Sequence, residues 1–136
     1  MHLIKILNVP ILSLAIEQFN RQDFYACHDT LEALWLEAEP TDRGFYQGIL
    51  QLAVGCYHLQ NLNQRGALIL WGEGLRRLCV YQPHHQGIAI SPLVADFYQW
   101  LQFLQGLTAA QLPFGQEELL QQGPLPTIQL LQTEGS

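Results

Sequence analysis

The chain has 136 residues, of which 49% are hydrophobic and 13% are charged, and this composition excludes an intrinsically disordered chain. The length favours one domain, residues 1–136, with a core of its own. Twelve acidic residues against six basic ones give a net charge of −6, which argues against nucleic acid as a partner.

The amino-terminal stretch MHLIKILNVPILSLAIEQF is apolar, but Pro10 and Glu17 interrupt it. The run is too short for a membrane span, and no small-residue cleavage site follows it, so we expect no membrane partner. Proline is favoured in the first turn of a helix, which predicts a helix from Pro10 to about residue 21. Three cysteines without paired spacing indicate a reducing compartment, and we therefore expect a cytoplasmic protein.

Hydrophobic residues recur with helical spacing nearly everywhere, and no segment alternates convincingly with a period of two. Asp23 is a suitable N-cap for a second helix, from Phe24 to about Glu39. Pro40 should stop that helix, since the residue before a proline avoids the helical conformation. Thr41 or Asp42 would then cap a third helix that ends near residue 62.

A fourth helix is expected from Asn63 to about Tyr81, with Glu73 and Arg77 as a favourable i,i+4 ion pair. The stretch QPHHQGIAISP that follows is typical of a loop, and Ser91 with Pro92 is a strong start for a fifth helix, through about residue 105. After that helix we expect a short helical turn near 116–121 within a loosely docked tail, residues 106–136. The predicted fold is an all-α bundle of about five helices with short connections, whose motif-bearing core spans about 10–105.

Polar and aromatic residues gather on one side of the second and third helices. On a helical wheel, the second helix carries Tyr25, His28, Glu32 and Trp35 along the border of its apolar stripe. The third helix carries Gln47, Gln51 and His58 on one face. A short connection makes the two helices antiparallel neighbours. We therefore expect these side chains to converge on one seam, with His28 level with His58, Glu32 near Gln51 and Trp35 near Gln47.

The residues of this seam also carry a resemblance to a known family. The segments FYACHDTLEALW and YQGILQLAVGCYHLQNLNQRGAL resemble the signature of domain-of-unknown-function family 309, over about residues 13–80. The resemblance implies a small helical bundle and brings no established activity. Asp29 stands where the family usually has glutamate. The matching residues are Phe24, Tyr25, His28, Leu31, Glu32, Trp35, Gln47, Gly48, Gln51, Leu52, Ala53, Tyr57, His58, Gly66 and Ala67.

Two kinds of functional site fit these residues. In the first, His28, Glu32 and His58 are the ligands of a divalent metal such as zinc, with one position open for water. In the second, His28 and His58 are acid–base groups, and Glu32 fixes the tautomer of His28. The amides of Gln47 and Gln51 would then hold a small polar ligand, with Tyr25 and Trp35 as walls of the site. Either arrangement would support hydrolysis if the protein is an enzyme.

A third interpretation gives the cluster no ligand. His28, Glu32 and the two glutamines would satisfy one another as a buried polar network that sets the register of the helices. The protein would then be a non-catalytic interaction module, whose apolar residues serve a homodimer or another homo-oligomer. The sequence leaves these three interpretations open.

Overall fold

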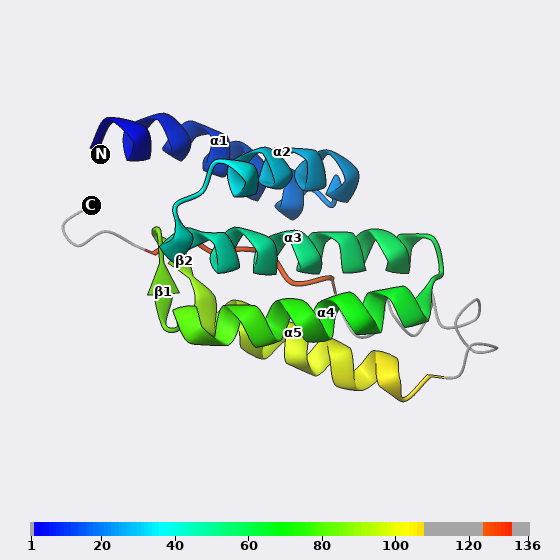
Figure 1. The fold of residues 1–136 in the computed structure, drawn as a ribbon. Coiled ribbons are helices and arrows are strands. Elements are labelled where there is room, and N and C mark those ends of the chain that lie inside the picture. The colour runs from blue at the N-terminus through cyan, green and yellow to red at the C-terminus, as the bar shows by residue number, and fades with distance from the viewer. Residues whose placement is uncertain (1, 108–123, 132–136) are drawn as a thin grey trace.

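Five helices and one small hairpin make up the described part of the chain (Figure 1). The structure, a computed structural model, describes residues 2–107 and 124–131, with side chains from Pro10 onward. The expected helical turn at 116–121 lies outside these residues. The elements are α1 (His2–Asn20), α2 (Phe24–Leu36), α3 (Pro40–Gln60), α4 (Gln64–Leu78), the 3₁₀ turn η1 (Cys79–Tyr81), β1 (His84–His85), β2 (Ile88–Ala89) and α5 (Ile90–Gln105).

The prediction of a mostly helical fold with five helices is confirmed, and the differences lie at the helix ends. Pro10 is inside α1, which begins at His2. The second helix ends at Leu36, three residues early, and Pro40 opens α3 instead of merely stopping α2. The last helix begins at Ile90, so Ser91 and Pro92 lie within its first turn.

The hairpin in the expected loop is a strand feature that the sequence did not predict. Each strand has two residues, with His85 opposite Ile88 in the register. The two residues between them, Gln86 and Gly87, have φ values of 50° and 76°. Positive φ at both central positions is the requirement of a type I′ turn, which joins two antiparallel strands tightly. Strands this short show no alternation, so periodicity could not reveal them.

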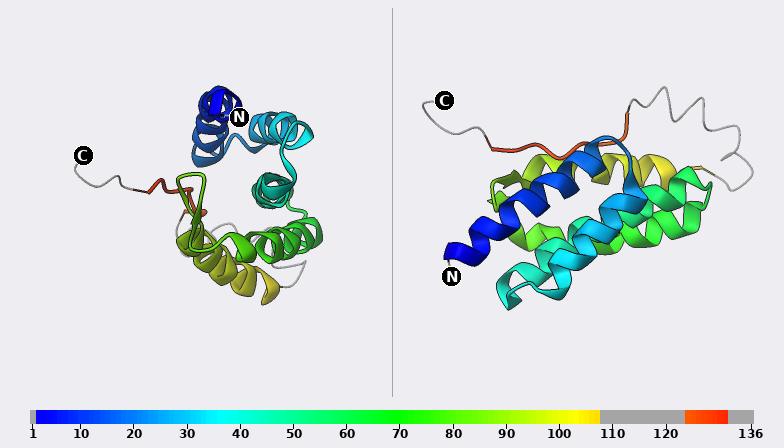
Figure 2. Two further views of the ribbon diagram at one scale, coloured as in Figure 1. Left: turned by 60° about the vertical axis from the view of Figure 1, so that its left-hand side comes forward. Right: turned by 90° about the horizontal axis from the view of Figure 1, so that it is seen from above.

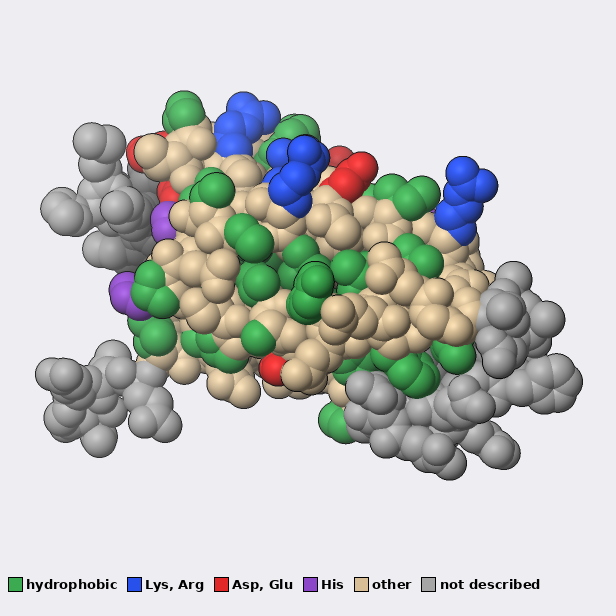
Figure 3. All heavy atoms as spheres, turned by 90° about the horizontal axis from the view of Figure 1, so that it is seen from below, with side chains coloured by type: hydrophobic (Ala, Val, Ile, Leu, Met, Phe, Trp, Pro, Cys, Tyr) green, Lys and Arg blue, Asp and Glu red, His purple; other side chains and the backbone are tan. Residues whose placement is uncertain are grey.

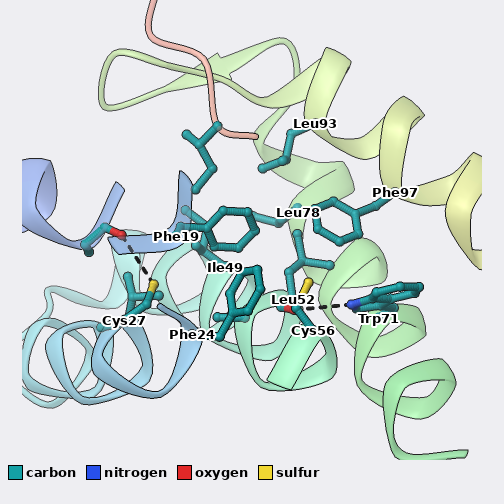
Figure 4. Close-up of a cluster of buried hydrophobic side chains, with 14 of the residues drawn as sticks. Phe19, Phe24, Cys27, Ile49, Leu52, Cys56, Trp71, Leu78, Leu93 and Phe97 are labelled. Carbon is teal, nitrogen blue, oxygen red and sulfur yellow. Dashed lines mark hydrogen bonds between the residues drawn. The ribbon is translucent and has the colours of Figure 1, made fainter. Parts of the chain in front are cut away.

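Small residues let α3 and α4 approach each other closely. A Cβ added to Gly74 would lie 2.8 Å from the carbonyl oxygen of Gly48, and one added to Gly48 would lie 2.7 Å from Leu78 Cγ. Trp71 fills the space beside this crossing, fully buried, and donates a hydrogen bond from Nε1 to the carbonyl of Leu52 at 3.2 Å (Figure 4). The indole N–H of Trp71, a polar group inside the core, thus finds its hydrogen-bond partner on the neighbouring helix.

The helices follow one another along a curve, with α1 and α5 at its two ends (Figure 2). Aromatic side chains link these two ends. Phe97 of α5 has ring-centroid distances of 6.0 Å to Phe19 of α1 and 5.5 Å to Trp71 of α4, both edge-on. Edge-to-face pairs of this kind add to the stabilisation that burial already gives. Phe97 therefore connects the first helix to the fourth in the centre of the core (Figure 4).

Residues 124–131 lie against the end of α1 and the hairpin, more firmly held than the expected loose tail. Asn20 donates from Nδ2 to the carbonyl of Ile128 at 2.9 Å and accepts at Oδ1 from the backbone N–H of Ile128 at 2.7 Å. The backbone N–H of Ala89 donates to Gln129 O at 2.9 Å, and that of Leu131 to Gly87 O at 2.8 Å. The buried side chain of Ile128 completes the core on this side.

The face formed by α4 and α5 carries hydrophobic side chains along its middle and basic side chains along one edge (Figure 3). Ile69 of α4 and Tyr98 of α5 are exposed. The homo-oligomer expected from the composition stays a prediction, and this face offers apolar surface that a second copy could bury. None of the helices in the described ranges is both long and apolar enough to cross a bilayer.

Candidate functional site

His28 lies between two carboxylates on the outer surface of α2. Its Nδ1 is 3.2 Å from Oδ1 of Asp29, and its Nε2 is 3.6 Å from Oε2 of Glu32. The side chains of His28 and Glu32 are 34% and 49% exposed. His28 and Glu32 are thus open to water, which differs from the buried polar network of the third interpretation.

Two shallow pockets run along the seam between α2 and α3, and His28 lines both. The first has a volume of about 180 Å³, and the second about 170 Å³. The other residues of the first pocket are Phe24, Tyr25, Val54, Tyr57 and His58. The other residues of the second pocket are Glu32, Trp35, Gln47 and Leu50. The structure thus brings six of the seven candidate residues to one seam, all except Gln51, while their roles stay predictions.

Aromatic rings form the outer wall of the first pocket. The rings of Tyr25 and Tyr57 lie 5.7 Å apart between centroids, tilted by 58°, and the ring of Tyr25 lies 6.3 Å from that of His28. Tyr25 is 62% exposed and Tyr57 is 37% exposed, which is high for such large side chains on a folded protein. The pocket is therefore apolar and open to solvent at the same time.

His58 is fixed in one orientation by the turn between α3 and α4. Asn63 is the N-cap of α4, and its Oδ1 accepts a hydrogen bond from the backbone N–H of Gly66 at 3.0 Å. The amide nitrogen of Asn63 then faces Nδ1 of His58 at 3.3 Å. Since an amide nitrogen only donates, Nδ1 of His58 accepts, and the hydrogen of the neutral ring is on Nε2.

Gly66 leaves room for this arrangement. A Cβ at position 66 would come within 2.9 Å of the His58 ring and 2.6 Å of the Asn63 amide nitrogen. With its hydrogen on Nε2, His58 presents a donor, whereas a metal ligand needs a bare ring nitrogen. The geometry around Asn63 therefore favours His58 as a hydrogen-bond donor over the predicted role as a metal ligand.

Gln51 has a different neighbour from the one expected. Its Nε2 donates to Oε2 of Glu73 at 2.9 Å, and its Oε1 accepts from Nε of Arg77 at 3.1 Å. Both partners belong to α4, so Gln51 lies between α3 and α4 and not beside Glu32 at the seam. The predicted ion pair of Glu73 with Arg77 is accordingly replaced by an amide that bridges the two charged groups.

Arg43 lies at the far end of the seam, with its guanidinium carbon 5.0 Å from the ring centroid of Trp35. This is the distance at which a cation interacts favourably with an aromatic face. The contact holds Trp35 against the start of α3 and gives the second pocket a fixed end wall. This contact could have been predicted, because Trp35 was expected near the start of the third helix, where Arg43 lies.

A second histidine–carboxylate pair, which was not predicted from the sequence, joins the hairpin to α3. Nε2 of His85 lies 2.7 Å from Oδ1 of Asp42, and the His85 ring lies 4.7 Å from both the Phe45 and Tyr81 rings. Gln86 donates to the hydroxyl of Tyr46 at 3.0 Å beside it. Burial, followed by the charge of Asp42, raises the pKa of Tyr46. These contacts fasten the hairpin to the bundle.

Comparisons with known proteins concern the part of the chain that contains the seam. Residues 12–70 match the sequence profile of the family described as Domain of unknown function (DUF309). The chain is also 31% identical over 93 residues to "Uncharacterized protein YpuF" of Bacillus subtilis (strain 168), a match that covers 68% of this chain. The chain spans about half the length of that relative, with 51% covered. No solved structure matches the chain. Residues 12–70 of this chain, which include every residue of the two seam pockets, therefore form a DUF309 domain.

Proposed function

We propose that the seam between α2 and α3 binds a small molecule, with His28 as its central polar group. The observation that carries this proposal is that His28 lines both seam pockets. Its Nδ1 faces the carboxylate of Asp29, which only accepts hydrogen bonds, so the hydrogen of the neutral ring is on Nδ1. The remaining nitrogen, Nε2, is a bare acceptor beside Glu32.

A bare imidazole nitrogen can accept a hydrogen bond from a ligand or take a proton from it. Asp29 supports both abilities, because its carboxylate faces Nδ1 and so leaves Nε2 as the nitrogen that can accept. Hydrolysis of a bound molecule by a water that His28 activates is the reaction that this arrangement supports best. The volumes of the pockets limit the ligand to a small molecule.

A fragment screen followed by two-dimensional ¹H–¹⁵N NMR tests the proposal. Fragments that bind should shift amide resonances on both sides of the seam, around Tyr25 and around Gln47. The variant His28→Ala should keep the dispersed spectrum of a folded protein and lose these shifts. The matched control is His84→Ala, an exposed histidine outside both pockets. Shifts that survive in His28→Ala, or that cluster away from the seam, would contradict the proposal.

A divalent metal such as zinc is a second candidate ligand, favoured by one further observation. One ligand atom from each of His28, Asp29 and Glu32 lies within 4.8 Å of the others. Nε2 of His28 and a carboxylate oxygen of Glu32 would be the protein ligands, and Asp29 would orient the imidazole through Nδ1. Water molecules or a small ligand would fill the remaining coordination positions.

Isothermal titration with zinc chloride, on protein without a histidine tag, tests this second candidate. We expect binding at about one ion per chain that His28→Ala abolishes and Glu32→Gln weakens at least tenfold. Glu37→Gln is the control, because Glu37 is an exposed acid just after α2 that lines neither pocket. Zinc binding of the same affinity in the wild type and in His28→Ala would sink the metal candidate.

A further inference from the structure

We infer that the ligand of the seam is an organic ammonium ion, an amine that carries a compact apolar body. This inference rests on the proposed function and adds the chemical class of the ligand. It follows from the different character of the two pockets that meet at His28.

The first pocket fits an apolar body. Apart from the two histidines, its wall consists of Phe24, Tyr25, Val54 and Tyr57, and the two tyrosine rings stand exposed at its edge. Exposed aromatic surface that is concave is favourable for a hydrocarbon or aromatic group, because the ligand removes both surfaces from water. Its volume of about 180 Å³ suits a group of about the size of a single aromatic ring.

The second pocket fits a cationic head group. Glu32 and Gln47 place oxygen acceptors there, and Nε2 of His28 is an acceptor as well. In the described part of the chain, neither Asp29 nor Glu32 forms an ion pair with a lysine or arginine. Asp29 faces Nδ1 of His28, so Glu32 is the carboxylate with an oxygen left for a partner, while Arg43 contacts the ring of Trp35.

The charge around the seam favours the same ligand. Asp29 and Glu32 carry two negative charges beside His28, whereas Arg43 brings one positive charge to the far end of the second pocket, against the ring of Trp35. An anionic ligand would be repelled by this field, while an ammonium ion is attracted to it and can donate up to three hydrogen bonds.

His28 connects the two halves of the site. Because it lines both pockets, a ligand with its body against the tyrosines can place its head group beside Glu32 by passing this one ring. The ammonium would donate to Glu32 and to Nε2 of His28. Asp29, on the far nitrogen of the same ring, would keep that Nε2 free to accept.

Three probes with the same phenyl ring test the charge preference. They are 2-phenylethylamine, which is a cation at neutral pH, 2-phenylethanol, which is neutral, and 3-phenylpropanoate, which is an anion. Titrations followed by ¹H–¹⁵N NMR should show the amine binding at the seam about tenfold more tightly than the alcohol, with the anion weakest. The preference for the amine should shrink as salt is added.

Two variants separate the two halves of the site. Glu32→Gln should weaken the amine about fivefold and leave the alcohol unchanged, because only the charge is removed. Tyr57→Leu should weaken all three probes, since they share the ring. Glu37→Gln should change none of them.

The outcomes distinguish this inference from the proposed function. If the alcohol or the anion binds at the seam as tightly as the amine, or if Glu32→Gln leaves amine affinity unchanged, the inference is overturned while the seam remains a binding site. If fragments of other kinds shift the seam resonances but no amine does, the inference again fails alone. If nothing shifts the seam resonances, both fail together.

Discussion

The side-chain amide of Asn63 donates a hydrogen bond to the ring of His58 and accepts another from the first turn of α4. Its nitrogen lies 3.3 Å from Nδ1 of His58, and its oxygen accepts from the backbone N–H of Gly66. Asn63, the N-cap of α4, therefore also determines which ring nitrogen of His58 carries the hydrogen. The capping bond fixes the amide orientation, and the amide orientation fixes the tautomer.

Asn63→Asp should reverse the tautomer of His58. Aspartate caps a helix about as well as asparagine, so α4 should remain intact, but its carboxylate accepts where the amide donated. We expect Nε2–H in the wild type and Nδ1–H in the variant, measured from the ¹⁵N shifts of the imidazole nitrogens. Asn61→Asp adds the same charge in the same turn, without the contact to His58, and should leave the tautomer as it is. An Nδ1–H tautomer in the wild type would refute the assignment.

Gln51→Leu should lower the free energy of unfolding by about 1–2 kcal/mol, because two partly buried hydrogen bonds to Glu73 and Arg77 are lost. Urea denaturation followed by circular dichroism measures this change. Gln47→Leu is the control, a half-buried glutamine one turn earlier, and should change stability by less than about 0.5 kcal/mol. Equal losses in the two variants would show that the bridge to α4 contributes little.

Gly55→Ala should destabilise the protein by about 1–3 kcal/mol through overpacking. The added Cβ would lie 2.4 Å from Cδ1 of Trp71, a fully buried ring that also donates to Leu52 O and has little freedom to move.

Gly72→Ala is the matched variant on the neighbouring helix. Nothing lies within 4 Å of a Cβ at Gly72, so alanine should stabilise α4 by about 0.5–1 kcal/mol through its better helix propensity. Thermal denaturation of both variants measures the difference. No loss of stability in Gly55→Ala would contradict the close packing of α3 on α4, and a loss in Gly72→Ala would contradict the open space at that position.

Cys79 should be alkylated first among the three cysteines. It is exposed, whereas Cys27 and Cys56 are buried, and burial raises the pKa of both thiols, that of Cys27 to about 12. Iodoacetamide at pH 8 followed by mass spectrometry should find one modified cysteine in the native protein and three in urea. Rapid modification of Cys27 in the native protein would contradict its burial beneath α1.

The same raised pKa predicts an alkaline limit of stability. A thiol with an ordinary pKa of 9.0 unfolded and about 12 folded favours the folded state fully below pH 9. This contribution is lost as the pH rises from 9 towards 12. The melting temperature should therefore fall over this range, and Cys27→Ala should fall less steeply. Parallel curves for the wild type and the variant would argue against the raised pKa.

Much of the fold was predictable from local signals, because the helices depend on residues near their own ends. The fourth helix begins within one residue of the expected start, with Asn63 as its N-cap, and His28 and Glu32 are one turn apart on an α2 face at the seam. Gln51 contacts α4 and not α2 as predicted, because α3 packs against both of these helices. Positions four residues apart on a helix differ in direction by about 40°, enough to turn Gln51 towards the other neighbour while Gln47 stays at the seam.

Contacts between distant residues could not be predicted from one sequence. Asn20 and Ile128 exchange two hydrogen bonds across 108 positions, and neither residue belongs to a local pattern that points to the other. The role of Asn63 beyond capping was hidden for a related reason. Its partner, His58, lies five positions earlier across a turn, so a helical wheel of either helix alone does not bring the two side chains together.

Phe97 shows that the folding unit is larger than the segment that matches DUF309. It belongs to α5, outside residues 12–70, yet its ring contacts Phe19 inside that segment and Trp71 directly after it. A fragment cut at residue 70 would lose both Trp71 and Phe97 and leave the inner sides of α1 and α3 facing water. Work on the seam in isolation therefore needs α5 in the expressed protein, even though every pocket residue lies before it.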